Sequence, residues 1–124
     1  MDLKRMSINK FIKNLEGIKS LLLDTYLYNF NISKSNGKRL VELKVQELKQ
    51  YLELNNAMVY YITIENEIAA FIWFFERDFI NERRMHVNQI IVKDEYRGLG
   101  LAQKLMYKVE QEAKKNNIKK LTYL

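Results

Sequence analysis

The first part of the chain carries apolar side chains at the spacing of a helix. Between residues 8 and 28 they recur every three or four positions, so one side of a helix over this range is apolar. Ser7 stands directly before the repeat and is a suitable N-cap. Ahead of it, Leu3 to Met6 predicts a short strand.

A polar segment separates this helix from a second one. Residues 29–38 are polar and contain Asn36-Gly37, a pair typical of turns, so we expect a loop here. Helical spacing then resumes from Leu40 and predicts a second helix that ends near Leu54.

The pattern changes to strands in the middle of the chain. Met58 to Ile64 is β-branched and aromatic, and Ile68 to Phe75 follows at once, which predicts an antiparallel hairpin that turns at Asn66. Because Ile68 to Phe75 is apolar at every position, we expect a central strand covered on both faces.

Two more strands and a helix complete the order. Residues 77–84 are strongly charged and predict a loop, and Met85 to Val92 predicts a strand. Helical spacing runs from Leu101 to about Asn117, and a further strand is expected from Lys120. The order (β)ααβββαβ predicts an α/β (α+β) fold in which helices cover both faces of one sheet.

The segment between the last long strand and the last helix has the layout of a phosphate site. It reads Arg97-Gly98-Leu99-Gly100-Leu101-Ala102 and holds two of the 4 glycines in the chain. Glycine lets the backbone approach an anion, and the amides of a first helical turn attract negative charge. The alternative is that the glycines serve only a tight strand-to-helix turn. A P-loop is excluded because no GK[ST] follows, and Gln103 breaks the dinucleotide fingerprint.

Composition excludes several other chemistries. The chain of 124 residues has no Cys and 1 His, which excludes disulfides, thiol nucleophiles and multi-histidine or cysteine metal sites, so no metal is expected. The net charge of +6 suits an anionic partner without choosing one. No apolar run approaches the ~20 residues of a membrane helix. We therefore expect a cytoplasmic protein, and the abundance of Lys, Asn and Ile suggests a bacterial source with an A+T-rich genome.

The phosphate-site segment and its surroundings resemble a known family. The run VNQIIVKDEYRGLGLAQKLMYKVEQEAKKNNIKKL is similar to the acetyl-CoA-binding core of the GNAT (Gcn-related) N-acetyltransferases. Their motif, Q/R-x-x-G-x-G/A, fits Arg97, Gly100 and Ala102, and Val92 precedes the arginine by the family's five residues. The order of elements agrees over the whole chain.

The resemblance implies a fold, a co-substrate and a reaction. The fold is a mixed, mostly antiparallel sheet with helices on both faces, and the reaction moves an acetyl group from acetyl-CoA to a primary amine in a ternary complex. The pantetheine arm is implied to bond the backbone of Ile90, Ile91 and Val92, while amides from Gly98 to Gln103 hold the pyrophosphate. The implied cofactor-binding residues are Ile90, Ile91, Val92, Arg97, Gly98, Leu99, Gly100, Leu101, Ala102 and Gln103.

The attacking amine also needs a group that takes its proton. The family often places that group four or six residues before the valine, which here means Asn88 and His86. Asn88 cannot act as a base but is able to hold a water molecule or the substrate. His86 titrates in the right range, although a lone histidine there is more often a partly exposed strand residue. Even spacing predicts that both share a strand face with Ile90 and Val92.

The chain differs from the family at its end. We expect residues 1–124 to form one acetyl-CoA-binding domain that lacks the family's last helix and strands, and we expect residues 118–124 to contact a second copy in a homo-oligomer. Two alternatives to an active enzyme follow: a CoA-binding sensor without catalysis, or a basic interaction module. Scattered lysines without interleaved exposed aromatics argue against a nucleic-acid surface.

Overall fold

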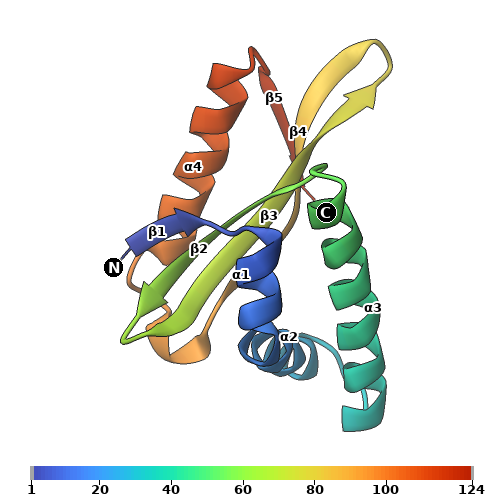
Figure 1. Cartoon of the computed structure of the whole chain (residues 1–124), viewed down its shortest axis with the longest axis vertical. Helices are drawn as coiled ribbons and strands as arrows, with labels where there is room; N and C mark the ends of the chain where they lie inside the picture. The colour runs from blue at the N-terminus through green and yellow to red at the C-terminus, as the bar shows by residue number, and fades with distance from the viewer. Residues whose placement is uncertain (1, 124) are drawn as a thin grey trace.

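The computed structural model describes residues 2–123 as one five-stranded sheet with helices on both faces (Figure 1). The strand order is β1-β2-β3-β4-β5, in which only β4 and β5 run parallel. The elements are β1 Asp2–Arg5, α1 Ile8–Lys13, α2 Leu15–Asn29, α3 Lys34–Glu53, β2 Met58–Ile64, β3 Glu67–Phe79, β4 Glu82–Val92, the 3-10 helix η1 Asp94–Tyr96, α4 Leu101–Lys115 and β5 Lys120–Tyr123. The predicted mixed, mostly antiparallel α+β fold is confirmed.

Two apolar cores lie on opposite faces of the sheet. Helices α1, α2 and α3 cover one side, which we call the three-helix face, and α4 covers the other, the α4 face. Successive residues of β3 alternate between them: Phe71 and Trp73 enter the first core, and Ile72 and Phe74 enter the second. The prediction that Ile68 to Phe75 forms a central strand covered on both sides is therefore confirmed.

The helix predicted over residues 8–28 is two helices, so that prediction is wrong in its continuity. Ser7 caps α1 as expected, since its side chain accepts a hydrogen bond from Lys10 N at 3.1 Å. At Asn14 the helix ends, because the Asn14 side chain donates to Lys10 O at 2.8 Å and competes with helical bonding. The apolar spacing continues across this break because both helices face the same core.

The loop predicted over residues 29–38 is confirmed only over residues 30–33 and is wrong beyond them, since α3 already begins at Lys34. Ser33 is its N-cap and accepts from Asn36 N at 3.1 Å. Gly37 is therefore a buried helical residue. A Cβ atom there would lie 3.0 Å from Leu23 Cδ1 and 3.1 Å from Leu27 Cδ2, so glycine lets α3 approach α2 closely.

The charged segment 77–84 is a hairpin tip, where a loop was predicted. Strands β3 and β4 continue to a two-residue turn at Ile80 and Asn81, which have φ values of 47° and 61°. Across this ribbon Arg83 pairs with Glu76 at 3.4 Å and with Asp78 at 3.5 Å. Charged side chains thus stabilise strands that carry no apolar alternation, and the ribbon projects from the body of the molecule (Figure 1).

The strand expected from Lys120 is present as β5, and it pairs with the edge of β4. It pairs in parallel from Lys120, opposite Arg84, to Tyr123, opposite Val87. Tyr123 is exposed, and Leu124 lies outside the described residues. The contact of residues 118–124 with a second copy stays a prediction.

The close approach of α3 to α2 gives a direct test of this packing. Gly37→Leu should lower the free energy of unfolding by about 1–3 kcal/mol, because its side chain meets Leu23 and Leu27. Urea denaturation measures the change. Gly17→Leu is the matched control, since Gly17 is also helical and has no atom within 4 Å of its Cβ position. The control should be neutral or gain about 0.5–1 kcal/mol from helix propensity. Equal behaviour of the two variants would contradict the packing role of Gly37.

Candidate functional site

The segment after β4 forms an open strand-to-helix turn. Gly98 and Gly100 adopt φ values of +82° and +77°, a region that other residues rarely enter. Gly100 is the N-cap of α4 and offers no side-chain hydrogen bond to the first helical turn. The amides of that turn are therefore open to an external acceptor, and the helix dipole favours an anion there.

A group of ion pairs holds η1 against the start of β3. Lys93 Nζ contacts Glu67 and Glu95, each at 3.0 Å, and the Tyr96 hydroxyl donates to Glu67 at 3.1 Å. Hydrogen bonds to Glu95 and Glu67 raise the pKa of Lys93, and the bond from Lys93 lowers the pKa of Glu67. These contacts tie the chain just before the glycine turn to the β2–β3 hairpin.

Most of the predicted cofactor-binding residues line one open pocket of about 670 Å³. Its lining is Ile90, Val92, Tyr96, Arg97, Gly98, Gly100, Leu101, Ala102 and Gln103. Two predicted residues are not among its lining. The Ile91 side chain is buried in the core of the three-helix face, and Leu99 is exposed to solvent.

The backbone of β4 beside this pocket has one edge turned away from β3. Lys93 N donates to Ala69 O at 2.7 Å, which places Lys93 among the residues bonded to β3. Ladder bonds alternate in direction along an antiparallel strand, so the backbone groups of Val92 and Ile90 face the opposite edge. The described part of β5 pairs with β4 only as far as Val87.

Strand β4 contains a β-bulge, so the residues predicted to share one strand face do not all lie on the same face. Trp73 is opposite Gln89 and Phe74 is opposite Val87, so Asn88 is an extra residue in the ladder. His86 packs against Phe75 on the three-helix face, whereas Ile90 and Val92 pack on the α4 face. The prediction that even spacing puts all four on one face is wrong, because the extra residue reverses the alternation.

His86 is buried, with 4% of its surface exposed, and not the partly exposed residue typical of a strand start. Its Nδ1 atom lies 2.7 Å from the Thr122 hydroxyl on β5. Burial lowers the pKa of the imidazole below its usual 6.5, and the charge of Arg77 adds to the effect. At pH 7 the ring is therefore neutral and able to accept a proton.

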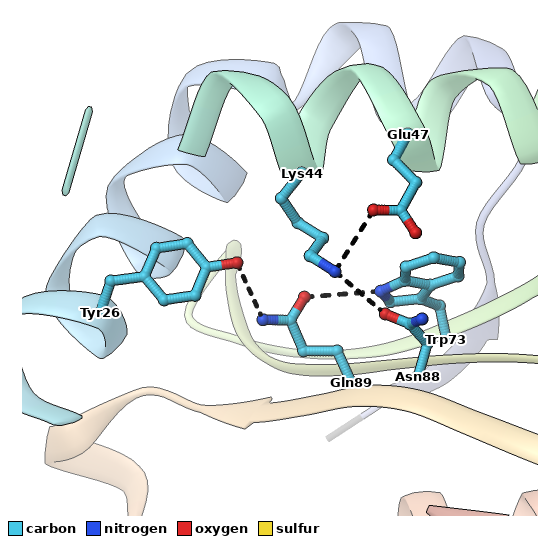
Figure 2. A network of polar contacts seen from close by, with 6 residues as sticks. All are labelled: Tyr26, Lys44, Glu47, Trp73, Asn88 and Gln89. Carbon is cyan, nitrogen blue, oxygen red and sulfur yellow. Dashed lines mark hydrogen bonds and ion pairs between the residues drawn. The ribbon is translucent and has the colours of Figure 1, made fainter. Parts of the chain in front are cut away.

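Side chains from four elements form a polar cluster at the bulge (Figure 2). Lys44 Nζ on α3 donates to Asn88 Oδ1 at 3.2 Å and lies 3.5 Å from a Glu47 carboxylate oxygen. On the same face, Gln89 accepts from Trp73 Nε1 and donates to the Tyr26 hydroxyl, both at 3.4 Å. We call these six residues, Tyr26, Lys44, Glu47, Trp73, Asn88 and Gln89, the bulge cluster.

Sequence analysis named only Asn88 of this cluster. The one signal available was the Asn88-Gln89 pair in an otherwise apolar strand end. Lys44 lies within an ordinary amphipathic pattern, so nothing in the sequence separates it from a solvated lysine. Burial raises the pKa of Tyr26, which keeps its hydroxyl protonated.

Within residues 2–123, no three His, Cys, Asp or Glu side chains converge in a way that would hold a metal ion. None of the helices described combines the length and the apolar character that a bilayer crossing requires.

Comparison with known proteins decides the family. The model of the "Acetyltransferase (GNAT) family" matches residues 16–124. The chain belongs to the GNAT acetyltransferase family. The predicted resemblance is thereby confirmed, and an N-acetyltransferase kind of activity is supported. A search of curated protein sequences finds no match.

Solved structures of GNAT proteins share this fold. A GCN5-related N-acetyltransferase from Ralstonia eutropha superposes with a TM-score of 0.80 at 13% identity, covering 99% of this chain and 82% of the other. A predicted acetyltransferase from Clostridium acetobutylicum, solved with acetyl-CoA, gives 0.75 at 19% identity, covering 99% and 79%. An aminoglycoside acetyltransferase from an uncultured soil sample, in complex with sisomicin, gives 0.72 at 16% identity, covering 99% and 76%.

The buried histidine of this GNAT chain predicts a specific pH dependence. Because the folded-state pKa of His86 lies below its unfolded value, the unfolded chain binds the proton more readily. The contribution of His86 to stability is full above pH 6.5 and is lost as the pH falls from 6.5 through the folded-state pKa.

Urea denaturation between pH 7.5 and 5.5 measures this effect. Because His86 is the only histidine in the chain, no other imidazole contributes to the pH dependence. His86→Gln should flatten the dependence over this range. A wild-type stability that does not change between pH 7.5 and 5.5 would contradict the burial of a neutral imidazole.

Proposed function

We propose that this GNAT chain transfers the acetyl group of acetyl-CoA to a primary amine. The observation that carries the proposal is the pocket of about 670 Å³ at the N-terminus of α4, which the motif residues line. A pyrophosphate has the charge that the helix N-terminus and Arg97 favour. Gly98 and Gly100 have positive φ values and carry no side chain that would block an approaching phosphate.

The free edge of β4 is suited to the rest of the co-substrate. Backbone groups of Ile90 and Val92 face away from β3, so they are able to bond the amides of an extended pantetheine arm. A backbone N–H at this edge is also suited to hold the thioester carbonyl oxygen as negative charge develops on it. The amine nitrogen forms a bond to the carbonyl carbon, the carbon–sulfur bond breaks, and CoA leaves as a thiolate.

The amine proton needs an acceptor, and for this we propose His86. Its low pKa keeps the imidazole neutral at pH 7. Because only 4% of the residue is exposed, the proton would reach it through the Thr122 hydroxyl at 2.7 Å. Asn88 lies at the bulge between His86 and the pantetheine-binding stretch, where its amide is placed to hold the acceptor or a water molecule.

A chain that binds CoA without catalysis is the second candidate. It is favoured by the burial of His86, which is only 4% exposed and so does not itself face a bound acceptor. Release of free CoA thiol with a panel of primary amines separates the candidates. Binding of acetyl-CoA without thiol release from any amine would favour the second.

The phosphate site is tested by changing Gly100. Gly100→Asp places a negative charge beside the expected phosphates and should weaken acetyl-CoA binding about a hundredfold, measured by titration calorimetry. Gly100→Ala shares the unfavourable backbone conformation without the charge, so it should weaken binding much less. Unchanged affinity in Gly100→Asp would remove the phosphate site from this turn.

The role of His86 is tested by its pH–rate profile. His86→Ala should lower kcat/KM about a hundredfold and abolish the acidic limb of the profile, because no base then titrates. Thr122→Val, which keeps the imidazole but removes the hydroxyl beside it, should lower kcat/KM while the limb remains. A loss below threefold in His86→Ala, with the limb intact, would show that the histidine is only structural.

A further inference from the structure

The bulge cluster holds a charged group in an unusual place. The Lys44 side chain is only 19% exposed, and it extends from α3 over the Trp73 ring, with Nζ 5.5 Å from the ring centroid. Lysine side chains are mostly exposed in folded proteins, so Lys44 is partly withdrawn from water. Its one carboxylate contact within residues 2–123, Glu47, is 3.5 Å away and 43% exposed, which makes it a weak ion pair.

The cluster also offers more donors than acceptors. The Lys44 ammonium has three N–H donors, and the described residues provide it with two partners, Asn88 Oδ1 and Glu47. The Asn88 amide nitrogen, which carries two more donors, has no acceptor among the described residues. The Tyr26 hydroxyl accepts from Gln89, while its own proton finds no acceptor in the same range.

These donors lie beside the reacting end of the proposed donor site. Asn88 precedes Ile90 on β4 by two residues, and Ile90 begins the stretch expected to hold the pantetheine arm. Figure 2 shows Lys44 reaching from α3 to Asn88, so the ammonium and the bulge face each other across the same small space. A small molecule bound to Lys44 on the three-helix face would reach this stretch at the edge of β4, because the described part of β5 pairs with β4 only as far as Val87.

We propose that Lys44 and Asn88 bind a carboxylate on the acceptor, so that the acceptor class is an amine that also carries a carboxylate, as an amino acid does. The proposal rests on the proposed function and narrows its substrate. A carboxylate supplies acceptors for the unused donors of Lys44 and Asn88 and neutralises the partly exposed ammonium.

Matched acceptors test this directly. 4-Aminobutyrate and its carboxamide have the same length and the same amine, and they differ in the charge of the far end. The wild-type chain should favour the carboxylate about tenfold or more in kcat/KM, measured by release of CoA thiol. Lys44→Met should abolish the preference while it keeps the apolar stem. Lys49→Met, a change to an exposed lysine on the same helix, should leave it intact.

Trp73 provides a second readout that needs no turnover. It is the only tryptophan of the chain and lies against Lys44, so its fluorescence should change when a carboxylate binds. Titration with 4-aminobutyrate, with and without CoA, should saturate in the wild type and in Lys49→Met. It should fail in Lys44→Met and with the carboxamide.

The outcomes separate this inference from the proposed function. Saturable, Lys44-dependent fluorescence without thiol release supports the carboxylate site and counts against catalysis. Thiol release with equal use of acid and amide, or a preference that survives in Lys44→Met, overturns the carboxylate site and leaves acetyl transfer standing. Absence of any fluorescence change with 4-aminobutyrate, together with no preference in turnover, also overturns the site.

Discussion

Strand β4 carries one extra residue at a bulge opposite β3, and the arrangement of the site follows from that residue. Asn88 is the extra residue in the ladder between Trp73 and Phe74. Before the bulge, β4 presents His86 to the three-helix face, and after it Ile90 and Val92 point to the α4 face. At the bulge itself, Asn88 and Gln89 both contact groups of the three-helix face. One strand thereby serves a pocket on one side and a polar cluster on the other.

The two faces of the sheet have different roles in the proposed reaction. Past the end of β4, the glycine turn and the first turn of α4 suit the phosphates of acetyl-CoA, and the pocket there is lined by the two glycines together with Arg97 and several apolar side chains. On the three-helix face, α2 and α3 carry Tyr26 and Lys44 to the bulge, where an acceptor would be recognised by side chains. The close packing of α3 on α2 at Gly37 sets the position from which Lys44 reaches β4.

The sequence was most informative where one local rule acts alone. Apolar periodicity predicted the strands of the central hairpin and α4, and the spacing of Arg97, Gly100 and Ala102 predicted the family. Prediction from the sequence failed where tertiary contacts overrule local preference. Asn36-Gly37 is typical of a turn, yet Gly37 is helical because α2 packs against it. The ribbon over 77–84 is held by cross-strand ion pairs that no apolar pattern reveals.

The bulge was not predictable from β4 alone, because an extra residue is defined only by the partner strand. Its effect on the site is large, since it removes His86 from the face of Ile90 and Val92. The place of Lys44 in the bulge cluster was not predictable for a related reason. It depends on packing between segments that lie 44 residues apart in the chain.

Amide NMR during titration with CoA and with pantetheine tests the central claim most directly. If the β4 edge holds the pantetheine arm and the glycine turn holds the pyrophosphate, CoA shifts the amide signals of Ile90 to Val92 and of Gly98 to Gln103. Pantetheine, which lacks the pyrophosphate, then shifts only the first group. CoA-induced shifts that leave both groups unmoved, or pantetheine shifts centred on the glycine turn, would contradict the account.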